Sequence, residues 1–427
     1  MRREQRSDQA DPPPARPGRP LWRRLAVLAL APLLALSAAS ATAQGVWVAA
    51  QEMPTERLNL AAVSAKCPEA SRGTCVYAIG GQVGTQVPTA TDTFESYSPV
   101  TGAWTTLRRM QTRRYAFAAA TAPCPGGVKG DCVYVIGGTG PGGRALNDAQ
   151  AYSTETGHWL TLPPLPTTRS STAAATAPCP EGLGVHGTCV YVFGGLRNGL
   201  HTTVEAYSPA TNTWATLPPL QAARFGHGGA AAPCPGTLAL HGTCVYAISG
   251  SGDDDGGILD SVEVYSPVLN AWQYAAPIPT PRTHFGAAAA PCPEGISDGC
   301  VHSVGGSTTS RDTHEAYTPV TNAWVTLPPL PRGRHFLGSA AAPCPRDTKN
   351  DCVYAVGGAV TSAPTDDNQA FSIERGHAEH KPKPKPEAKP VPKPEAKPGN
   401  PPGAPQEQLP QGPQEPQTAP EQPPARP

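Results

Sequence analysis

An arginine recurs at one position along this 427-residue chain, always ten residues before the first cysteine of a cysteine pair. Guanidinium groups bind carboxylates and sulfates through two parallel hydrogen bonds, so a ring of them would suit a carboxylate, a sulfate or an acidic sugar. Three histidines, His227, His284 and His335, lie close to the arginines in three of the repeats and are further candidate ligand-binding residues. The candidate arginines are Arg57, Arg114, Arg169, Arg224, Arg282 and Arg334.

The same arginines have a second interpretation as fasteners. A side chain that is repeated in every unit could hold its unit together by bonding backbone carbonyls or a carboxylate in a later strand. Four repeats offer such a carboxylate in a Glu-x-Tyr pattern, at Glu95, Glu205, Glu263 and Glu315. The histidines could likewise be locally bonded polar residues. The sequence leaves both interpretations open.

The twelve cysteines form six regular pairs, which we expect to be disulfides of an exported protein. Zinc is the alternative, since His186 and His241 each lie three residues before a cysteine, but four pairs have no such histidine and structural zinc favours closer cysteine spacing. We therefore expect no metal site. The expected pairs are Cys67 with Cys75, Cys124 with Cys132, Cys179 with Cys189, Cys234 with Cys244, Cys292 with Cys300, and Cys344 with Cys352.

Residues 1–43 are typical of a secretory signal peptide. A basic stretch precedes the apolar run "LAVLALAPLLAL", and the small residues of Ala41-Thr42-Ala43 follow it. The run of 12 apolar residues is shorter than the roughly 20 needed to cross a bilayer, so we expect no membrane span in the mature form. This pattern predicts secretion to the extracellular space or periplasm by either the general or the twin-arginine route.

Residues 377–427 are rich in Pro, Lys, Glu and Gln, a composition that predicts a disordered tail. The tail could be a solvated spacer, or its basic first half could associate with anionic polymers of the cell envelope. Lys plus Arg and Asp plus Glu both number 33, so the charge balance gives no reason to expect a nucleic-acid partner.

Residues 44–376 contain six copies of one unit. The hydrophobic run "CVYVIGG" and its variants recur every 52–57 residues, each preceded by a small-residue run and followed by a tyrosine-bearing run. Five units then have a tryptophan, and the sixth lacks one. A further tryptophan, Trp47, precedes the first unit. Four short β runs in each of six units predict an all-β, six-bladed β-propeller with four-stranded blades. We expect the strand of Trp47 to close the last blade.

The Gly-Gly doublet after a hydrophobic strand, followed by Tyr and Trp at regular spacing, resembles the kelch repeat, with departures at Ser249 and Phe371. Two enzyme families have similar propellers, namely galactose-oxidase-like copper enzymes and sialic acid mutarotases. The copper chemistry requires a cysteine cross-linked to tyrosine, whereas all twelve cysteines here have assigned partners. We identify no motif for catalytic residues and expect no cofactor.

The alternating direction of the strands divides the loops between two faces. The cysteine-bearing hairpins and the turns before each tryptophan share the disulfide face, whose sequence is regular. The loops after each Gly-Gly and the links between units share the variable-loop face, which differs from unit to unit. Variable loops on a rigid scaffold favour binding. We expect a secreted, monomeric binding or scaffold module for an extracellular glycan, envelope polymer or protein. A mutarotase-type enzyme and a purely structural spacer are the alternatives.

Overall fold

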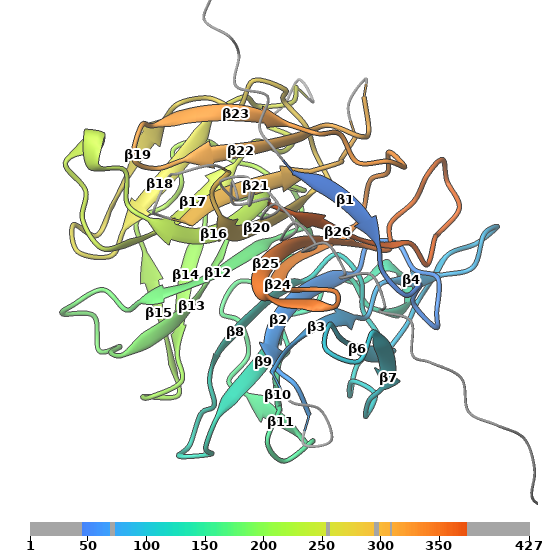
Figure 1. The fold of residues 1–427 in the computed structure, drawn as a ribbon. Coiled ribbons are helices and arrows are strands. Elements are labelled where there is room, and N and C mark those ends of the chain that lie inside the picture. Colours follow the sequence, from blue (N-terminus) through green and yellow to red (C-terminus); the bar gives the residue numbers. More distant parts are fainter. Residues whose placement is uncertain (1–44, 69–72, 253–256, 294–298, 308–309, 374–427) are drawn as a thin grey trace, which may run out of the picture. The chain divides into compact units, whose positions relative to one another are not determined.

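The computed structural model describes residues 45–68, 73–252, 257–293, 299–307 and 310–373. The expected signal peptide and tail lie outside the described residues. The described part forms six antiparallel sheets of four strands each, with a small two-stranded ribbon, β4 (Gln82–Val83) and β5 (Thr89–Ala90), in one loop. Two short 3-10 turns, Pro141–Gly143 and Gly236–Leu238, lie in other loops. The predicted all-β, six-bladed propeller is confirmed (Figure 1).

The innermost strand of each blade is the small-residue run, as predicted. Successive innermost strands contact one another, and the last contacts the first, so they close a ring around a central channel. Larger side chains would not fit, because a Cβ added at Gly229 would lie 2.7 Å from the Cβ of Ala173. These strands are β2 (Ala61–Lys66), β8 (Ala118–Pro123), β12 (Ala173–Pro178), β16 (Gly228–Pro233), β20 (Gly286–Pro291) and β24 (Gly338–Cys344).

The second strand of each blade is the cysteine-bearing run and contributes most of the core. Its Val, Tyr and Ile side chains are almost completely buried on both faces of the sheet, since a neighbouring blade packs on each face. These strands are β3 (Thr74–Ile79), β9 (Asp131–Ile136), β13 (Thr188–Phe193), β17 (Thr243–Ile248), β21 (Gly299–Val304) and β25 (Asp347–Val356).

The two outer strands contain the repeated tyrosine and tryptophan. The third strands are β6 (Phe94–Ser98), β10 (Ala149–Ser153), β14 (Val204–Ser208), β18 (Val262–Ser266), β22 (His314–Thr318) and β26 (Asn368–Ser372). The outermost strands are β7 (Ala103–Thr106), β11 (Trp159–Leu162), β15 (Thr213–Leu217), β19 (Ala271–Ala275), β23 (Ala323–Leu327) and, for the last blade, β1 (Val46–Ala49).

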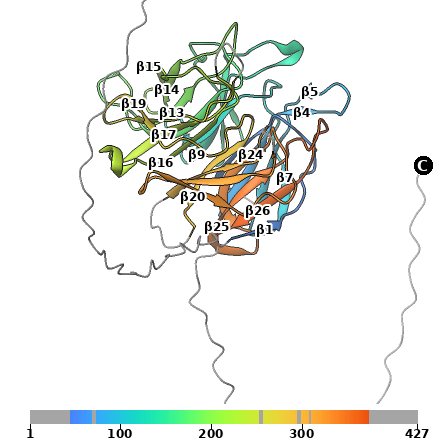
Figure 2. The ribbon, with the colours of Figure 1, turned by 90° about the horizontal axis from the view of Figure 1, so that it is seen from above.

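The ring is closed by the strand of Trp47, as predicted. Strand β1 pairs with β26 in antiparallel register, placing Trp47 opposite Phe371. Figure 1 shows blue β1 beside red-brown β26, and Figure 2 shows the same strands together from above. The first and sixth blades are therefore joined through residues more than 300 positions apart in the chain.

Each tryptophan also ties its blade to the preceding one. The indole N–H donates to a backbone carbonyl just beyond the preceding blade's outermost strand, as from Trp214 to Pro163 at 3.0 Å and from Trp47 to Pro328 at 2.9 Å. The same bond is present for Trp104, Trp159, Trp272 and Trp324. Each indole, buried at Trp272 and partly buried in the other five, thus satisfies its only donor while covering the seam between two blades.

Six disulfides bracket the hairpins between the first and second strands, one in each blade, and all six expected pairings are confirmed. Each bridge spans Cα atoms 4.9 Å apart, and among the described residues every cysteine is paired. The bridges join Cys67 to Cys75, Cys124 to Cys132, Cys179 to Cys189, Cys234 to Cys244, Cys292 to Cys300, and Cys344 to Cys352.

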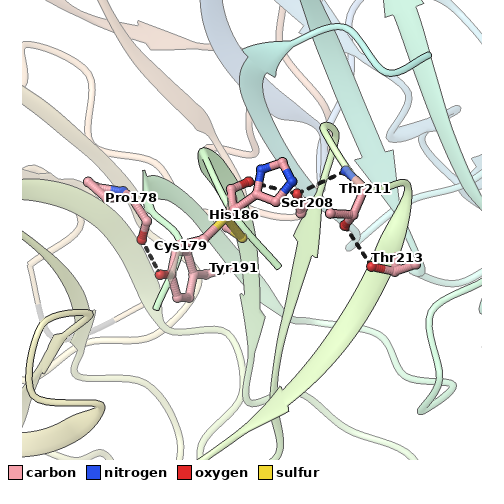
Figure 3. The surroundings of a disulfide bond; sticks show 8 residues. Pro178, Cys179, His186, Tyr191, Ser208, Thr211 and Thr213 are labelled. Carbon is pink, nitrogen blue, oxygen red and sulfur yellow. Dashed lines mark hydrogen bonds between the residues drawn. A yellow bond between two sulfur atoms is a disulfide. The ribbon is translucent and has the colours of Figure 1, made fainter. Parts of the chain in front are cut away.

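The third blade shows how its disulfide is surrounded (Figure 3). Beside the bridge from Cys179 to Cys189, the Tyr191 hydroxyl donates to the Pro178 carbonyl. In the same region, the Ser208 hydroxyl donates to the backbone carbonyl of His186, the residue considered above for zinc. Because both cysteines are oxidised, they offer no thiolate to a metal beside that histidine.

Metal-binding clusters and membrane-spanning helices are both absent from the described residues. Those residues contain no group of three or more His, Cys, Asp or Glu side chains arranged to hold a metal ion. Within the same ranges, no helix has the length and apolar character required to cross a bilayer.

Candidate functional site at the channel mouth

The six repeated arginines lie in the links that lead into the innermost strands, and all six side chains are fully buried. Each guanidinium group points into its own blade instead of toward solvent. Four of them pair with the carboxylates of the Glu-x-Tyr strands, which are also buried. The pairs are Arg57–Glu95, Arg169–Glu205, Arg224–Glu263 and Arg282–Glu315.

The fourth blade shows how completely such a guanidinium group is used. Arg224 donates to Glu263 at 2.6 Å and to the carbonyls of Ser249 and Ser261 at 2.9 and 3.1 Å. Burial lowers the pKa of Arg224 from its usual value, and the charge of Glu263 opposes that shift. These are the contacts expected of a fastener. An anion in the channel would have to compete with bonds that already satisfy the group.

Two blades lack the glutamate and use other partners. In the second blade, Gln150 occupies the glutamate position and Arg114 pairs instead with Asp148. In the sixth blade, Arg334 donates to the neutral side chain of Gln369 at 2.7 Å and to the carbonyls of Gly357 and Ala355, both at 2.8 Å. Burial lowers the pKa of Arg334 to about 10, opposed by the more distant charge of Asp367.

The backbone of each arginine connects it to the preceding blade. Its carbonyl accepts a hydrogen bond from the second residue of that blade's Gly-Gly doublet, as from Gly138 to Arg169 at 3.0 Å. This close approach explains the doublet, because a Cβ at Gly137 would lie 2.8 Å from the Arg169 carbonyl oxygen and its φ is +63°. Ser249 departs from the doublet at φ +53°, and its hydroxyl compensates by accepting from the Arg282 N–H at 2.9 Å.

Two residues beyond each arginine, the chain forms a closed ring of six backbone hydrogen bonds. Each N–H donates to the carbonyl of the equivalent residue in the preceding blade, over 2.7–3.1 Å. All six residues have positive φ, between +49° and +58°. We call these residues the channel mouth: Asn59, Ala116, Ser171, Gly226, His284 and Phe336.

The side chains of the channel mouth are all different and divide it into two halves. On one side, the rings of the mouth residues His284 and Phe336 pack together, with centroids 4.4 Å apart. Phe225, which precedes the mouth residue Gly226, packs against His284 with centroids 5.9 Å apart. Asn59, Ala116 and Ser171 stand on the other side, and all six mouth residues line a cavity of about 100 Å³. The mouth is therefore half aromatic and half small or polar, on a rigid backbone ring.

The three candidate histidines have different surroundings. His284 belongs to the mouth, where burial and then the neighbouring His335 lower its pKa to about 4. His335 is buried against Phe336, 4.4 Å between ring centroids. His227 packs beside Phe193 and lines the same cavity as His284. Among the described residues, neither of its ring nitrogens has a hydrogen-bond partner. Burial holds the pKa of His227 well below its usual value.

Sequence reasoning placed the arginines and histidines at the mouth, but of the six residues that form it, His284 alone was among the candidates. Asn59, Ala116, Ser171 and Phe336 share no residue type, so no motif marks them. What identifies them is their position, since each lies two residues after the repeated arginine of its blade.

Comparison with known sequences identifies the repeat. The Kelch motif matches residues 70–111, 120–166, 182–221 and 232–279, which fall in the first four blades. Kelch-like protein 40 of Xenopus tropicalis is 29% identical over 210 residues, covering 48% of this chain and 29% of the relative. Human Kelch-like protein 23 is 29% identical over 218 residues, covering 50% of this chain and 33% of the relative. Beta-scruin of Limulus polyphemus is 31% identical over 188 residues, covering 40% of this chain and 18% of the relative. In each of these three cases, the match covers a third or less of the relative's own length.

Proposed function

This chain belongs to the kelch-repeat family, and we propose that it is a non-enzymatic binding and scaffold module that recognises a protein partner at the channel mouth and the surrounding loops. The observation that carries the proposal is the contrast between a six-fold repeated scaffold and a mouth in which no two residues are alike. A site with one-sided chemistry can orient its partner, whereas a uniform ring could not.

The aromatic half of the mouth favours a protein segment with an exposed aromatic or aliphatic side chain. Phe225, His284 and Phe336 form one packed surface in which Phe336 is only partly buried. Aromatic residues supply large contact areas at little entropic cost, and they are typical anchors of protein interfaces. The imidazole of His284, neutral because its pKa is low, adds a polar group without a charge to desolvate.

The buried arginines support this site indirectly. Their side chains fasten each link to its own blade, and their carbonyls fasten it to the preceding blade, so the mouth residues are held from both sides. A rigid mouth loses little conformational freedom on binding. In this proposal the arginines position the recognition surface and do not contact the partner.

The six disulfides support a further element of the proposal, namely function outside the reducing cytosol. Secretion to the extracellular space or periplasm accords with residues 1–43 of the sequence. The cysteine state of the protein recovered from medium and from lysate, by alkylation and mass spectrometry, tests this element. Reduced cysteines in the recovered native protein would contradict it.

The experiment that tests the binding site is selection of a displayed random peptide library on the oxidised full chain. Selected peptides are then measured against a mouth variant, His284→Ala/Phe336→Ala. A matched control is Val268→Ala, which removes an exposed apolar side chain (75% exposed) from a turn on the disulfide face. We expect peptides with an aromatic or aliphatic anchor that lose at least tenfold in affinity for the mouth variant and keep their affinity for the control.

Two outcomes would overturn this proposal. Selected peptides that bind the mouth variant as well as the native chain would move the site elsewhere. An empty selection, together with binding of a glycan or envelope polymer on an array, would replace the protein partner with a polysaccharide. An acid–base enzyme of the mutarotase type is less favoured, because the described residues that line the mouth cavity include two imidazoles and no carboxylate.

A further inference from the structure

A second cavity, of about 300 Å³, lies at the seam between the sixth and first blades, away from the channel. One wall is Val48–Gln51, which comprises the last two residues of the closing strand β1 and the two residues after it. The opposite wall is Tyr97 on β6 with Gly102 in the turn after it, and Pro345 and Arg346 of the sixth blade's hairpin complete the cavity. We call it the seam cavity.

The first cause of the seam cavity is a missing leucine. At the end of the outermost strand, four of the other blades have Leu at one equivalent position. Leu162, Leu217 and Leu327 are buried there at 3–6% exposure. The sixth blade has Ala50 at this position, because Ala50 donates to the Asn368 carbonyl just as Leu107 donates to that of Phe94. Truncation of a buried leucine to alanine leaves space that neighbouring atoms fill only in part.

The second cause is a missing asparagine in the first blade. In three blades the repeated tyrosine donates its hydroxyl hydrogen to an asparagine five residues later, as from Tyr207 to Asn212 and from Tyr265 to Asn270, both at 2.6 Å. Tyr97 has Gly102 at that position, so its hydroxyl lacks the asparagine and the space of that side chain is empty.

The two omissions coincide at one seam of the six. The second blade also has a glycine, Gly157, but it faces a seam where Leu107 is present. The fourth blade also has an alanine, Ala275, but there Asn322 occupies the space and accepts from the Ala276 N–H at 2.9 Å. Within the described residues, only the seam between the sixth and first blades lacks both side chains.

The polar groups at the seam cavity are complementary to an anion. Arg346 is exposed, and among the described residues it forms no ion pair. The Arg346 backbone N–H donates to the Pro99 carbonyl, which fixes the hairpin against the first blade. Tyr97 and Arg346 both line this cavity. Burial raises the pKa of Tyr97, while the charge of Arg346 and the Gln51 backbone oppose that shift. A phenol hydroxyl, and a guanidinium group with no ion pair to any described residue, thus stand at one cavity.

We propose that the seam cavity binds a small organic carboxylate of the size of a hexuronic acid. The carboxylate contacts the guanidinium group of Arg346, and the Tyr97 hydroxyl hydrogen-bonds a hydroxyl of the ligand. A volume of about 300 Å³ is at the lower end of ligand pockets, which suits one sugar ring and not a polymer segment. This site is independent of the channel mouth and of the partner proposed there.

The test is titration of the oxidised full chain with D-glucuronate and, as its neutral counterpart, D-glucose, by calorimetry and ligand-observed NMR. Gly102→Asn is the filling variant. It restores the residue of three sister blades at a position with φ +68°, where Asn212 and Asn270 adopt +55° and +50°, and an added Cβ meets no atom within 4 Å. It should therefore fold. Arg346→Gln removes the charge. Gly157→Asn makes the same change at the sister turn, where Leu107 is present.

We expect glucuronate to bind at least tenfold more tightly than glucose, with at least a tenfold loss in Gly102→Asn and in Arg346→Gln and no change in Gly157→Asn. Equal affinity for the two sugars, no glucuronate binding, or binding that survives Gly102→Asn would each overturn the proposal. The mouth variant His284→Ala/Phe336→Ala should bind glucuronate normally, which distinguishes failure at this site from failure at the mouth.

Discussion

Two positions of the repeat lie only two residues apart and behave in opposite ways. The first is arginine in all six blades, fully buried and bonded inside its blade. The second is the channel mouth, where six different residues share one backbone conformation. The difference shows that repetition in this molecule marks the scaffold, and that specific chemistry must be sought where the repeat is broken.

The strongest way to break this comparison is to remove one of the repeated arginines. Arg224→Met leaves Glu263 buried without its cation, and we expect a loss of about 3–5 kcal/mol in the free energy of unfolding. Arg334→Met removes a guanidinium group bonded to Gln369 and three carbonyls, so only neutral partners lose a bond and we expect about 1–3 kcal/mol. Urea unfolding of both variants provides the measurement.

The two arginine variants control each other, because both remove the same side chain from equivalent links. Equal losses would mean that the carbonyl bonds, common to both blades, stabilise the links and that the ion pair adds nothing. Losses below about 1 kcal/mol in both would contradict the fastener role and return the arginines to the ligand-binding interpretation.

The sequence predicted the propeller because its information is repeated. Six copies of one strand pattern, one unit without tryptophan and one unassigned Trp47 suffice to predict both the blades and their closure. The arginines stayed ambiguous, because spacing places a side chain along the chain but does not tell whether it points into a blade or a channel. The mouth is formed by backbone hydrogen bonds, which residues of any type except proline can make, so it has no sequence signature. The seam cavity depends on absent atoms at Ala50 and Gly102, which only a superposition of the six blades reveals.

A second prediction concerns a scaffold position where the repeat is broken. The second strand of the fifth blade has His302 where the other five have tyrosine. Its Nε2 lies 3.1 Å from the Pro291 carbonyl oxygen, reproducing the tyrosine bond, and its Nδ1 lies 3.0 Å from Nε2 of His314. Both rings are buried, and His314 packs beside Trp47 and Phe371 of the closing blade.

Acid should destabilise this histidine pair. Burial lowers the pKa of His302 to about 4, and burial followed by the charges of His302 and Arg282 lowers that of His314. Well above pH 6.5 these side chains are neutral in both the folded and the unfolded protein. As the pH falls from about 6.5 toward 4, the unfolded chain takes up protons that the folded chain cannot. Stability is therefore lost, by about 2–3 kcal/mol at pH 4.5 from His302 alone.

Urea unfolding at pH 7.5 and 4.5 measures this effect. The variant His302→Tyr/His314→Val restores the residues of the third and fourth blades and should lose less stability on acidification than the native chain. The other buried histidines are present in both proteins, so their contributions cancel in the difference. An identical loss in the two proteins would show that the pair does not titrate differently on folding.

The smallest expected effect has the opposite sign and sharpens the comparison most directly. Ala116 adopts φ +49° in the channel mouth, although its side chain does nothing to favour that conformation, whereas the equivalent residue of the fourth blade is Gly226. If the scaffold imposes the conformation, Ala116→Gly relieves strain of about 1–3 kcal/mol in the folded state. Glycine also raises the conformational entropy of the unfolded chain, which offsets part of this gain. We expect a net gain of about 0.5–1 kcal/mol in the free energy of unfolding, measured by heat or urea.

The reverse change, Gly226→Ala, should destabilise the protein, because its new Cβ would lie 2.6 Å from the Thr283 hydroxyl oxygen. A loss of stability in Ala116→Gly would mean that the mouth residues help to set their own backbone, and the separation between scaffold and mouth would fail at its closest point.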